Sequence, residues 1–321
     1  MENLFLKLNE KINEYNKFII MGHKNPDLDS IGSCFGLYEI IKTLNKQCYV
    51  FLDIENVKEY NNTVLSAIEN IKGKINFLSE KNYKNVLDDK TLLIIVDVNQ
   101  TDRLECSEIL NTKVDTIILD HHMRSHNYIS DSIISYIDTN LSSITELVTF
   151  YAKSLNIDLN TIISTIMLAG IEIDTNSYNL RTTEDTYKAS AILMSFGADT
   201  ILKQELLKET MEDYINRADI VKTSFMITEN IAMCIFSNKC KKERLAEVAD
   251  EMLKFVDVEA SIAIGKLDSK TVGVSARSLG KIDVESIMKK LNGGGSITNA
   301  AAQVESSSIK EVKQRIIELV K

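Results

Sequence analysis

The chain has 321 residues, of which 44% are hydrophobic, and a formal net charge of −9. This size suffices for two domains with separate cores, and the acidic balance without a basic stripe argues against long nucleic-acid duplexes as partners. No apolar run approaches the roughly 18 residues that span a bilayer, no signal peptide opens the chain, and the five cysteines show no paired spacing, so we expect a cytoplasmic protein that does not enter membranes.

The segment 22–33, with the sequence GHKNPDLDSIGS, connects a strand to a helix. The apolar run 18–21 is short enough for a buried strand, and the apolar spacing of 31–44 predicts a helix. Ligands bind at the carboxyl ends of strands in open α/β sheets. Three side chains that bind metals lie at this point: His23, Asp27 and Asp29. The alternative is a capped loop in which Asp29 or Ser30 begins the helix.

Two further predicted strands also end in metal-binding side chains. The run 92–96 ends on Asp97, and the run 116–119 is followed by Asp120, His121 and His122. A fourth candidate is Asp174, after an apolar stretch from Ile162 that predicts a buried helix. A single Asp at a strand end is usually a turn residue, but four such places together favour a metal cluster. The helix start 142–146 adds either polar contacts near this cluster or plain capping.

The ligand types restrict the choice of metal. Carboxylates outnumber imidazoles and no cysteine lies at these places, so a thiolate zinc site is disfavoured. Mixed nitrogen and oxygen ligands suit Mn²⁺, with Mg²⁺, Co²⁺ or iron as alternatives. The candidates are too many for one ion that also holds substrate. Two ions about 3.5–4 Å apart, bridged by a shared carboxylate, imply hydrolysis of a phosphate ester.

Beyond this region the patterns change. Strand and helix patterns alternate from residue 17 to about 196, as in a doubly wound, mainly parallel α/β sheet. The segment 199–222 reads as one long connecting helix. Three apolar runs then predict a smaller mixed sheet with helices: 231–236, 260–264 and 271–276.

The order of these motifs, His-x3-Asp-x-Asp, a strand-end Asp, Asp-His-His and a later Asp, resembles the DHH phosphoesterase superfamily. The C-terminal GGGSITNAA of 293–301 is similar to the glycine-rich motif of the DHH-associated domain. Within the superfamily, the likeness is strongest to the catalytic part of GdpP-type cyclic-di-AMP phosphodiesterases, with NrnA-type nano-RNases next. It rests on three segments: 22–32, 96–99 and 274–280.

The resemblance implies an arrangement of domains. We expect a DHH catalytic domain at 1–198, the connecting helix at 199–222 and a DHH-associated α/β substrate-binding domain at 223–321, with the active-site cleft between the domains. GdpP-type proteins carry N-terminal membrane helices and sensory domains that this sequence lacks. Met1 and the amphipathic start of the chain favour a free-standing enzyme. A homodimer is a further expectation from the resemblance.

The resemblance also assigns six metal ligands, in two groups that share Asp97: His23, Asp27 and Asp97, and Asp29, Asp97, His121 and Asp174. Asp120 is expected to orient His121 and fix its tautomer. His122 is expected to face the substrate as a phosphate contact or proton donor, with a structural histidine beneath the sheet as the alternative. His126 matches no motif position and is expected at the surface.

Substrate contacts are expected from the C-terminal domain. Arg277 is the predicted phosphate clamp, because a guanidinium grips phosphate oxygens in a bidentate way; the alternative is an exposed arginine at a strand end. Arg181 is a second candidate. Glycines allow the backbone to approach an anion closely. The other predicted contacts belong to this loop: Gly293, Gly294, Gly295, Ser296, Thr298 and Asn299.

Two positions depart from the family pattern. Ser296 stands where relatives carry a histidine, and Asn292 replaces a further glycine. We therefore expect a manganese-dependent phosphodiesterase that acts on cyclic-di-AMP, on the linear di-adenylate, or on both. The alternatives are a nano-RNase with 3′-phosphoadenosine phosphatase activity, an inorganic pyrophosphatase, and a nucleotide sensor that does not hydrolyse its ligand.

Overall fold

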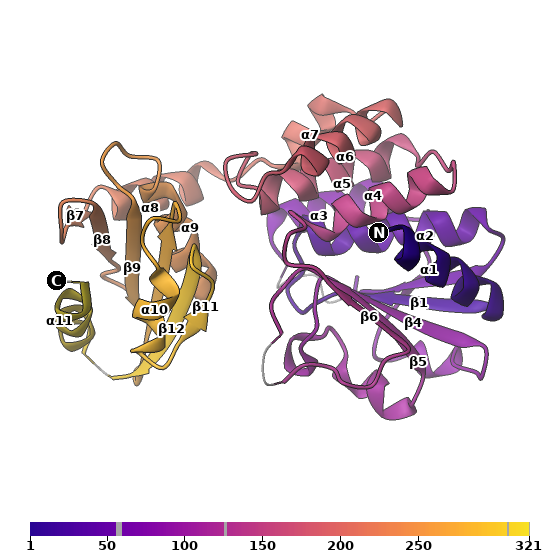
Figure 1. Cartoon of the computed structure of the whole chain (residues 1–321), viewed down its shortest axis with the longest axis horizontal. Helices are drawn as coiled ribbons and strands as arrows, with labels where there is room; N and C mark the ends of the chain where they lie inside the picture. Colours follow the sequence, from indigo (N-terminus) through magenta and orange to yellow (C-terminus); the bar gives the residue numbers. More distant parts are fainter. Residues whose placement is uncertain (56–59, 125–126, 307, 321) are drawn as a thin grey trace. The chain divides into compact units, whose positions relative to one another are not determined.

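A computed structural model describes residues 1–55, 60–124, 127–306 and 308–320. The chain forms two compact units, Met1–Lys208 and Glu209–Lys321, which are described separately (Figure 1). In the described part of the chain, no helix is both long and apolar enough to cross a bilayer.

The first unit is built on a six-stranded sheet in the order β3-β2-β1-β4-β5-β6, and every pair of neighbours is parallel. The strands are β1 (Lys17–Met21), β2 (Gln47–Phe51), β3 (Phe77–Leu78), β4 (Thr91–Val96), β5 (Asp115–Asp120) and β6 (Ile134–Ile137). The chain builds outward from β1 to β3 and then returns to place β4 against β1. This confirms the predicted doubly wound parallel sheet, with its switch point between β1 and β4.

In the described part of the first unit, this sheet is accompanied by the helices α1 (Glu2–Glu14), α2 (Leu28–Thr43), α3 (Asn62–Ile71), α4 (Ile144–Ser154), α5 (Thr161–Asp174), α6 (Glu184–Ser195) and α7 (Thr200–Leu206). Figure 1 shows them gathered on one face of the sheet. The other face is covered by short 3-10 turns: Tyr83–Asn85, Thr101–Arg103 and Ser107–Thr112. Successive strand residues point to opposite faces, so Ile20 joins the core under the helices and Ile19 joins the core under the turns.

Helix α2 begins earlier than predicted. Asp27 is its N-cap, and its Oδ1 accepts hydrogen bonds from the backbone N–H groups of Asp29 and Ser30, each at 3.0 Å. The cap is therefore neither Asp29 nor Ser30, the two residues that the alternative of a capped loop named. An extended backbone at Asp27 (φ −106°, ψ −170°) lets its side chain turn back over the first helical turn.

The expected single helix over 199–222 is two helices, α7 and α8 (Met211–Val221). Helix α7 ends at Leu206 in the first unit. Thr210 then caps α8, because its Oγ1 accepts from Asp213 N at 3.0 Å. The amphipathic pattern runs through both helices, so it did not reveal the break.

The second unit contains a mixed sheet in the order β11-β12-β10-β9-β8-β7, in which the β8–β9 pair is parallel and the other described pairs are antiparallel. Its strands are β7 (Phe225–Met226), β8 (Ile231–Ile235), β9 (Ala260–Lys266), β10 (Thr271–Ser278), β11 (Gly294–Gly295) and β12 (Asn299–Glu305). Besides α8, this unit contains the helices α9 (Lys242–Met252), α10 (Val284–Lys289) and α11 (Ile309–Val320). The predicted mixed sheet is confirmed, but β12 was not predicted as a strand, because its buried residues include small alanines.

Candidate metal centre

The candidate ligands of the first unit gather at the switch point of its sheet. His23 follows β1, Asp97 follows β4 and His121 follows β5. Asp29 lies in the first turn of α2, and Asp174 is the last residue of α5. Because β1 and β4 are neighbours, their carboxyl ends bring side chains from distant parts of the chain together.

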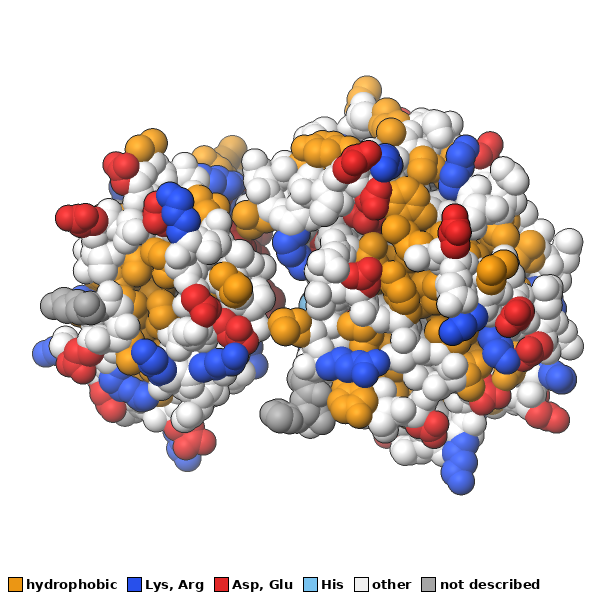
Figure 2. All heavy atoms as spheres, in the orientation of Figure 1, with side chains coloured by type: hydrophobic (Ala, Val, Ile, Leu, Met, Phe, Trp, Pro, Cys, Tyr) orange, Lys and Arg blue, Asp and Glu red, His pale blue; other side chains and the backbone are white. Residues whose placement is uncertain are grey.

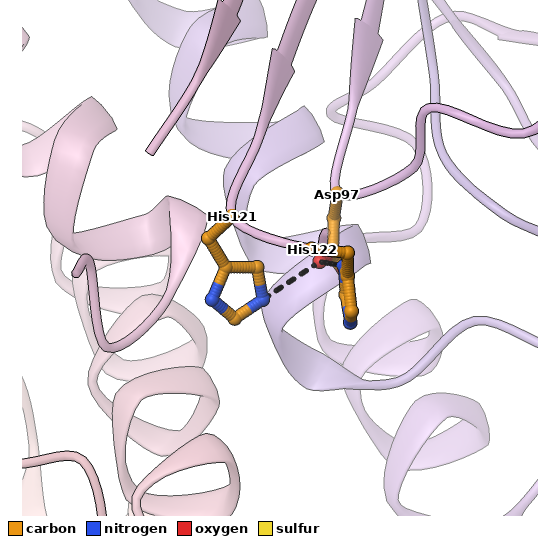
Figure 3. A group of neighbouring side chains, drawn as sticks. All are labelled: Asp97, His121 and His122. Carbon is orange, nitrogen blue, oxygen red and sulfur yellow. Dashed lines mark ion pairs between the residues drawn. The ribbon is translucent and has the colours of Figure 1, made fainter. Parts of the chain in front are cut away.

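Asp97 lies at the centre of this cluster. Its backbone is left-handed (φ 60°), a conformation that Asp adopts more readily than most residues. Its Oδ2 is 3.4 Å from His23 Nε2, and its Oδ1 is 3.2 Å from His121 Nε2. The second of these contacts is drawn in Figure 3. The two oxygens of one buried carboxylate thus face two different histidines.

The first group of ligand atoms belongs to His23, Asp27 and Asp97. His23 Nε2 lies 3.8 Å from Asp27 Oδ2, while Nδ1 is 2.8 Å from the carbonyl of Lys24. A carbonyl can only accept, so Nδ1 carries the proton and Nε2 is free to bind a cation. Burial lowers the pKa of His23, but Asp27 and Asp97 outweigh it and raise that pKa well above its ordinary value.

The second group belongs to Asp29, His121 and Asp174. His121 Nε2 is 3.3 Å from Asp174 Oδ2 and 4.0 Å from Asp29 Oδ2, and Nδ1 is 3.3 Å from the carbonyl of Leu141. Burial lowers the pKa of His121, but Asp97 and then Asp174 outweigh it and raise that pKa to about 10.

Asp29 is held by the beginning of α4. Its Oδ2 accepts from Ile144 N at 2.8 Å, and its Oδ1 accepts from both N and Oγ1 of Thr145 at 2.7 Å. Ser143 caps the same helix, because its Oγ accepts from Glu146 N at 3.2 Å. The helix start at 142–146 therefore does both things that the sequence left open, capping and polar contact with the cluster.

The electrostatics of the cluster suit cations. Burial and the neighbouring carboxylates raise the pKa of Asp29 to about 6, and burial followed by Asp29 raises the pKa of Asp174 well above its ordinary value. Burial also acts to raise the pKa of Asp97, but His121 and His23 outweigh it and hold that pKa well below its ordinary value. Asp97 Oδ1 and His121 Nε2 are buried without a hydrogen-bond partner among the described residues. These side chains can bind metal, because divalent cations would relieve the repulsion and engage the two buried atoms.

The Asp120-His121-His122 segment differs from the prediction in one contact. Asp120 Oδ1 accepts from His122 Nδ1 at 2.9 Å, whereas the ring of His121 is held by Leu141. Asp120 contacts His121 only through the backbone N–H, at 2.8 Å. The expectation that Asp120 fixes the tautomer of His121 is therefore wrong, because its carboxylate is turned toward the ring of the next residue. No sequence pattern indicated that the carbonyl of Leu141 would hold this ring.

Two further polar side chains, Arg181 and Asn99, lie beside the cluster. Arg181 Nη2 donates to Asp174 O at 3.0 Å and lies 3.8 Å from Asp174 Oδ2, so this cation stands beside the cluster. Asn99, which sequence reasoning left without a role, donates from Nδ2 to Asp120 Oδ2 at 2.5 Å. His126 lies outside the described residues.

The predicted substrate residues all lie in the second unit. Arg277 is within β10 and pairs in register with Asn299 of β12. Its Nε donates to Asp250 Oδ1 at 3.0 Å and its Nη1 to Ser275 Oγ at 3.1 Å. It is thus not the exposed strand-end arginine of the alternative, since only 15% of its side chain is accessible. Its role toward phosphate stays a prediction.

The glycine-rich segment forms a hairpin. Gly294 and Gly295 pair with β12, and Ser296 N donates to Asn299 O at 2.7 Å across the turn. Gly293 N donates to Met288 O at 2.9 Å. The N–H groups of Gly293 and Ser296 are therefore engaged within the protein. Ser296 Oγ accepts from Asn299 N at 3.2 Å and lies 3.5 Å from Thr298 Oγ1.

Comparison with known proteins agrees with this architecture. Two family profiles match the chain: the DHH family N-terminal domain over residues 17–171 and the DHHA1 domain over residues 227–321. The cyclic-di-AMP phosphodiesterase GdpP of Bacillus subtilis (strain 168) is 35% identical over 96% of this chain. That match covers 48% of GdpP, so the chain spans about half the length of this relative.

A second relative has nearly the same length. The probable bifunctional oligoribonuclease and PAP phosphatase NrnA of Streptococcus mutans is 25% identical over 97% of both chains. Among solved structures, an exopolyphosphatase-related protein from Bacteroides fragilis has a TM-score of 0.82 at 18% identity and covers 100% of this chain and 98% of its own. The two family matches show that this chain contains a domain of the DHH family followed by a DHHA1 domain.

Proposed function

We propose that this protein is a manganese-dependent phosphodiesterase that hydrolyses cyclic-di-AMP, the linear di-adenylate pApA, or both, to AMP. The observation that carries this proposal is the position of Asp97, with one oxygen toward His23 and the other toward His121. A carboxylate shared between two metal ions is typical of enzymes that hydrolyse phosphate esters. The similarity to GdpP, which is named a cyclic-di-AMP phosphodiesterase, supports the substrate class.

The proposed metal ligands are the members of the two groups above: His23, Asp27, Asp29, Asp97, His121 and Asp174. Asp97 is proposed to be shared by the two ions, because its Oδ1 also lies 3.2 Å from His121 Nε2 of the second group. Imidazole nitrogen and carboxylate oxygen suit Mn²⁺, with Mg²⁺ or Co²⁺ as alternatives. When bound, two such ions stabilise charge on phosphoryl oxygens and lower the pKa of water.

The remaining roles fall to side chains of both units. His122, whose side chain is 40% exposed, is proposed to contact a phosphoryl oxygen or to donate a proton to the leaving oxygen. Arg277 is proposed to bind phosphate, and its contact with Asp250 would orient the guanidinium. The other proposed substrate contacts are those of the glycine-rich hairpin: Gly293, Gly294, Gly295, Ser296, Thr298 and Asn299.

A short nucleotide also fits the surface charge better than a long duplex does. On the face seen in Figure 2, acidic and basic side chains are interspersed over both units rather than gathered by sign. Long duplexes are held by many lysines and arginines along a continuous path.

The first experiment compares hydrolysis of cyclic-di-AMP, pApA and 3′-phosphoadenosine with Mn²⁺, with products resolved over time. Rapid loss of cyclic-di-AMP would support turnover of the cyclic dinucleotide. Cleavage of pApA alone would restrict the proposal to linear dinucleotides, with Ser296 as the first suspect. No hydrolysis of any of the three would overturn it.

The alternative is a nano-RNase with 3′-phosphoadenosine phosphatase activity. The observation that favours it is the similarity to NrnA, at 25% identity over 97% of this chain. An inorganic pyrophosphatase and a nucleotide sensor rank below both. The sensor is disfavoured because every proposed metal ligand is present in the sequence.

A further inference from the structure

Asn99 lies two residues beyond Asp97 and is only 2% exposed. Its Nδ2 lies 2.5 Å from Asp120 Oδ2 and 3.0 Å from the carbonyl oxygen of His122. A carboxylate at this site and a carbonyl both accept hydrogen bonds, so the amide must turn its NH₂ group toward them. The loop after β4 is thereby tied to both ends of the Asp120–His122 segment.

Asp120 is completely buried, and its two oxygens have separate partners. Oδ1 accepts from the backbone N–H groups of His121 and His122, at 2.8 and 3.1 Å, and from His122 Nδ1 at 2.9 Å. Oδ2 accepts from Asn99. The carboxylate therefore cannot rotate without breaking a hydrogen bond at one of its oxygens.

The contact with Asp120 selects one tautomer of His122. A ring that donates from Nδ1 keeps its lone pair on Nε2. In the other tautomer, the lone pair of Nδ1 would face a carboxylate oxygen of Asp120. Both atoms would then be acceptors, and the contact would be repulsive. Nε2 is therefore the nitrogen of this partly exposed ring that can take up a proton and donate it to an oxygen of a bound phosphate ester.

We propose that Asn99 is a positioning residue for His122. By holding Asp120 Oδ2, Asn99 keeps Asp120 Oδ1 on the ring Nδ1–H of His122 and so presents Nε2 to the substrate. Asn99 belongs to none of the groups of potential metal ligands in the described part of the chain. This inference rests on the proposed phosphoester hydrolysis, in which His122 contacts the substrate.

A double-mutant cycle tests the proposal through activity. The Asn99→Ala variant removes both donors, and we expect kcat to fall about 10- to 100-fold, the range seen when a partner that orients an active-site group is lost, with a smaller change in KM. In a His122→Ala background, Asn99→Ala should lower kcat no further, because its effect passes through His122. Losses that multiply in the double variant would overturn the proposal.

A control variant separates positioning from stability. Thr116 is buried at the opposite end of β5, and its Oγ1 donates to Val114 O at 2.9 Å. Thr116→Val removes this partly buried hydrogen bond from the same strand and should lower the melting temperature without changing kcat. If Thr116→Val lowered kcat as much as Asn99→Ala does, loss of stability would explain both, and Asn99 would have no positioning role.

A second readout does not depend on activity. Long-range ¹H–¹⁵N spectra of the metal-free wild-type protein, at a pH at which the His122 ring is neutral, report its tautomer. We expect Nδ1–H in the wild type and a gain of Nε2–H in Asn99→Ala. Nε2–H in the wild type, or no change in the variant, would refute the role of Asn99. If the wild type hydrolysed no phosphate ester while these spectra behaved as expected, only the proposed function would fail.

Discussion

Substitution of the middle glycine of 293–295 separates substrate binding from folding. A Cβ added at Gly294 would meet no atom of the described residues within 4 Å. At Gly293 it would lie 2.2 Å from Ala301 O, and at Gly295, where φ is +149°, it would lie 2.2 Å from Asn299 O. Close approach of β12 thus explains the outer two glycines, whereas packing leaves the middle one unexplained.

The expected stabilities follow from these distances. Gly294 does not have a left-handed backbone, so Gly294→Ala should leave stability unchanged or raise it by about 0.4–1 kcal/mol through the unfolded chain. Gly293→Ala forces a methyl group against the backbone and should cost at least about 1–3 kcal/mol. Thermal unfolding of the two variants and the wild type checks this order.

The expected kinetics test the predicted substrate contact. If a phosphate or base lies against the backbone of Gly294, the added methyl group should raise KM about tenfold or more, equivalent to about 1.4 kcal/mol, at an unchanged melting temperature. The assay is steady-state hydrolysis of whichever dinucleotide the wild type accepts. Wild-type KM and kcat in Gly294→Ala would refute substrate approach at this residue, and a lower melting temperature would refute the packing argument.

Three further predictions concern the metal cluster. Asp97→Asn keeps the side-chain size and tolerates the left-handed backbone, so its circular dichroism spectrum should match that of the wild type. Its kcat should fall more than about 100-fold. Retained activity would refute the proposal that Asp97 is shared by two metal ions. Thr145→Val removes one hydrogen bond to Asp29 and should weaken Mn²⁺ binding, measured by calorimetry, about 10-fold. Thr145→Ser keeps the hydroxyl and should bind Mn²⁺ as the wild type does. Equal Mn²⁺ affinities of Thr145→Val and the wild type would show that this contact is unimportant. The folded-state pKa of His121 is raised from 6.5 to about 10, so its stabilisation of the metal-free protein is complete below pH 6.5 and is lost as the pH rises through about 10. The melting temperature of the metal-free protein should therefore fall over that pH range. A fall of the same size in the His121→Gln variant would contradict the assignment to His121.

Local patterns were sufficient to predict most of the first unit. The runs before His23, Asp97 and Asp120 are almost entirely apolar, which is typical of parallel strands buried on both faces. Their ends carry the candidate ligands, so strand periodicity and residue type together pointed to one edge of one sheet. The order of the strands in the sheet did not follow from these patterns, because several topologies could bring such strand ends together.

The errors arose where a neighbour distant in sequence decides the outcome. The alternative of a capped loop named Asp29 or Ser30 as the N-cap of α2, but Asp27 is the cap and Asp29 is held by Thr145, more than a hundred residues away. The break between α7 and α8 was missed because both helices continue one amphipathic pattern. Strand β12 was missed because its buried residues include the small Ala300 and Ala302, which join the core of the second unit.

The sequence by itself determined the kinds of ligand, their order and the alternation of strand and helix, because these depend on residue chemistry and on periodicity along the chain. Only the tertiary structure decided which atoms meet: the two oxygens of Asp97 toward two histidines, Leu141 on the ring of His121, and Asn99 behind Asp120. These contacts join residues from separate loops, and their geometry depends on the order and register of the strands that carry them. Neither order nor register is written in any local pattern, because each results from packing the whole sheet against its helices.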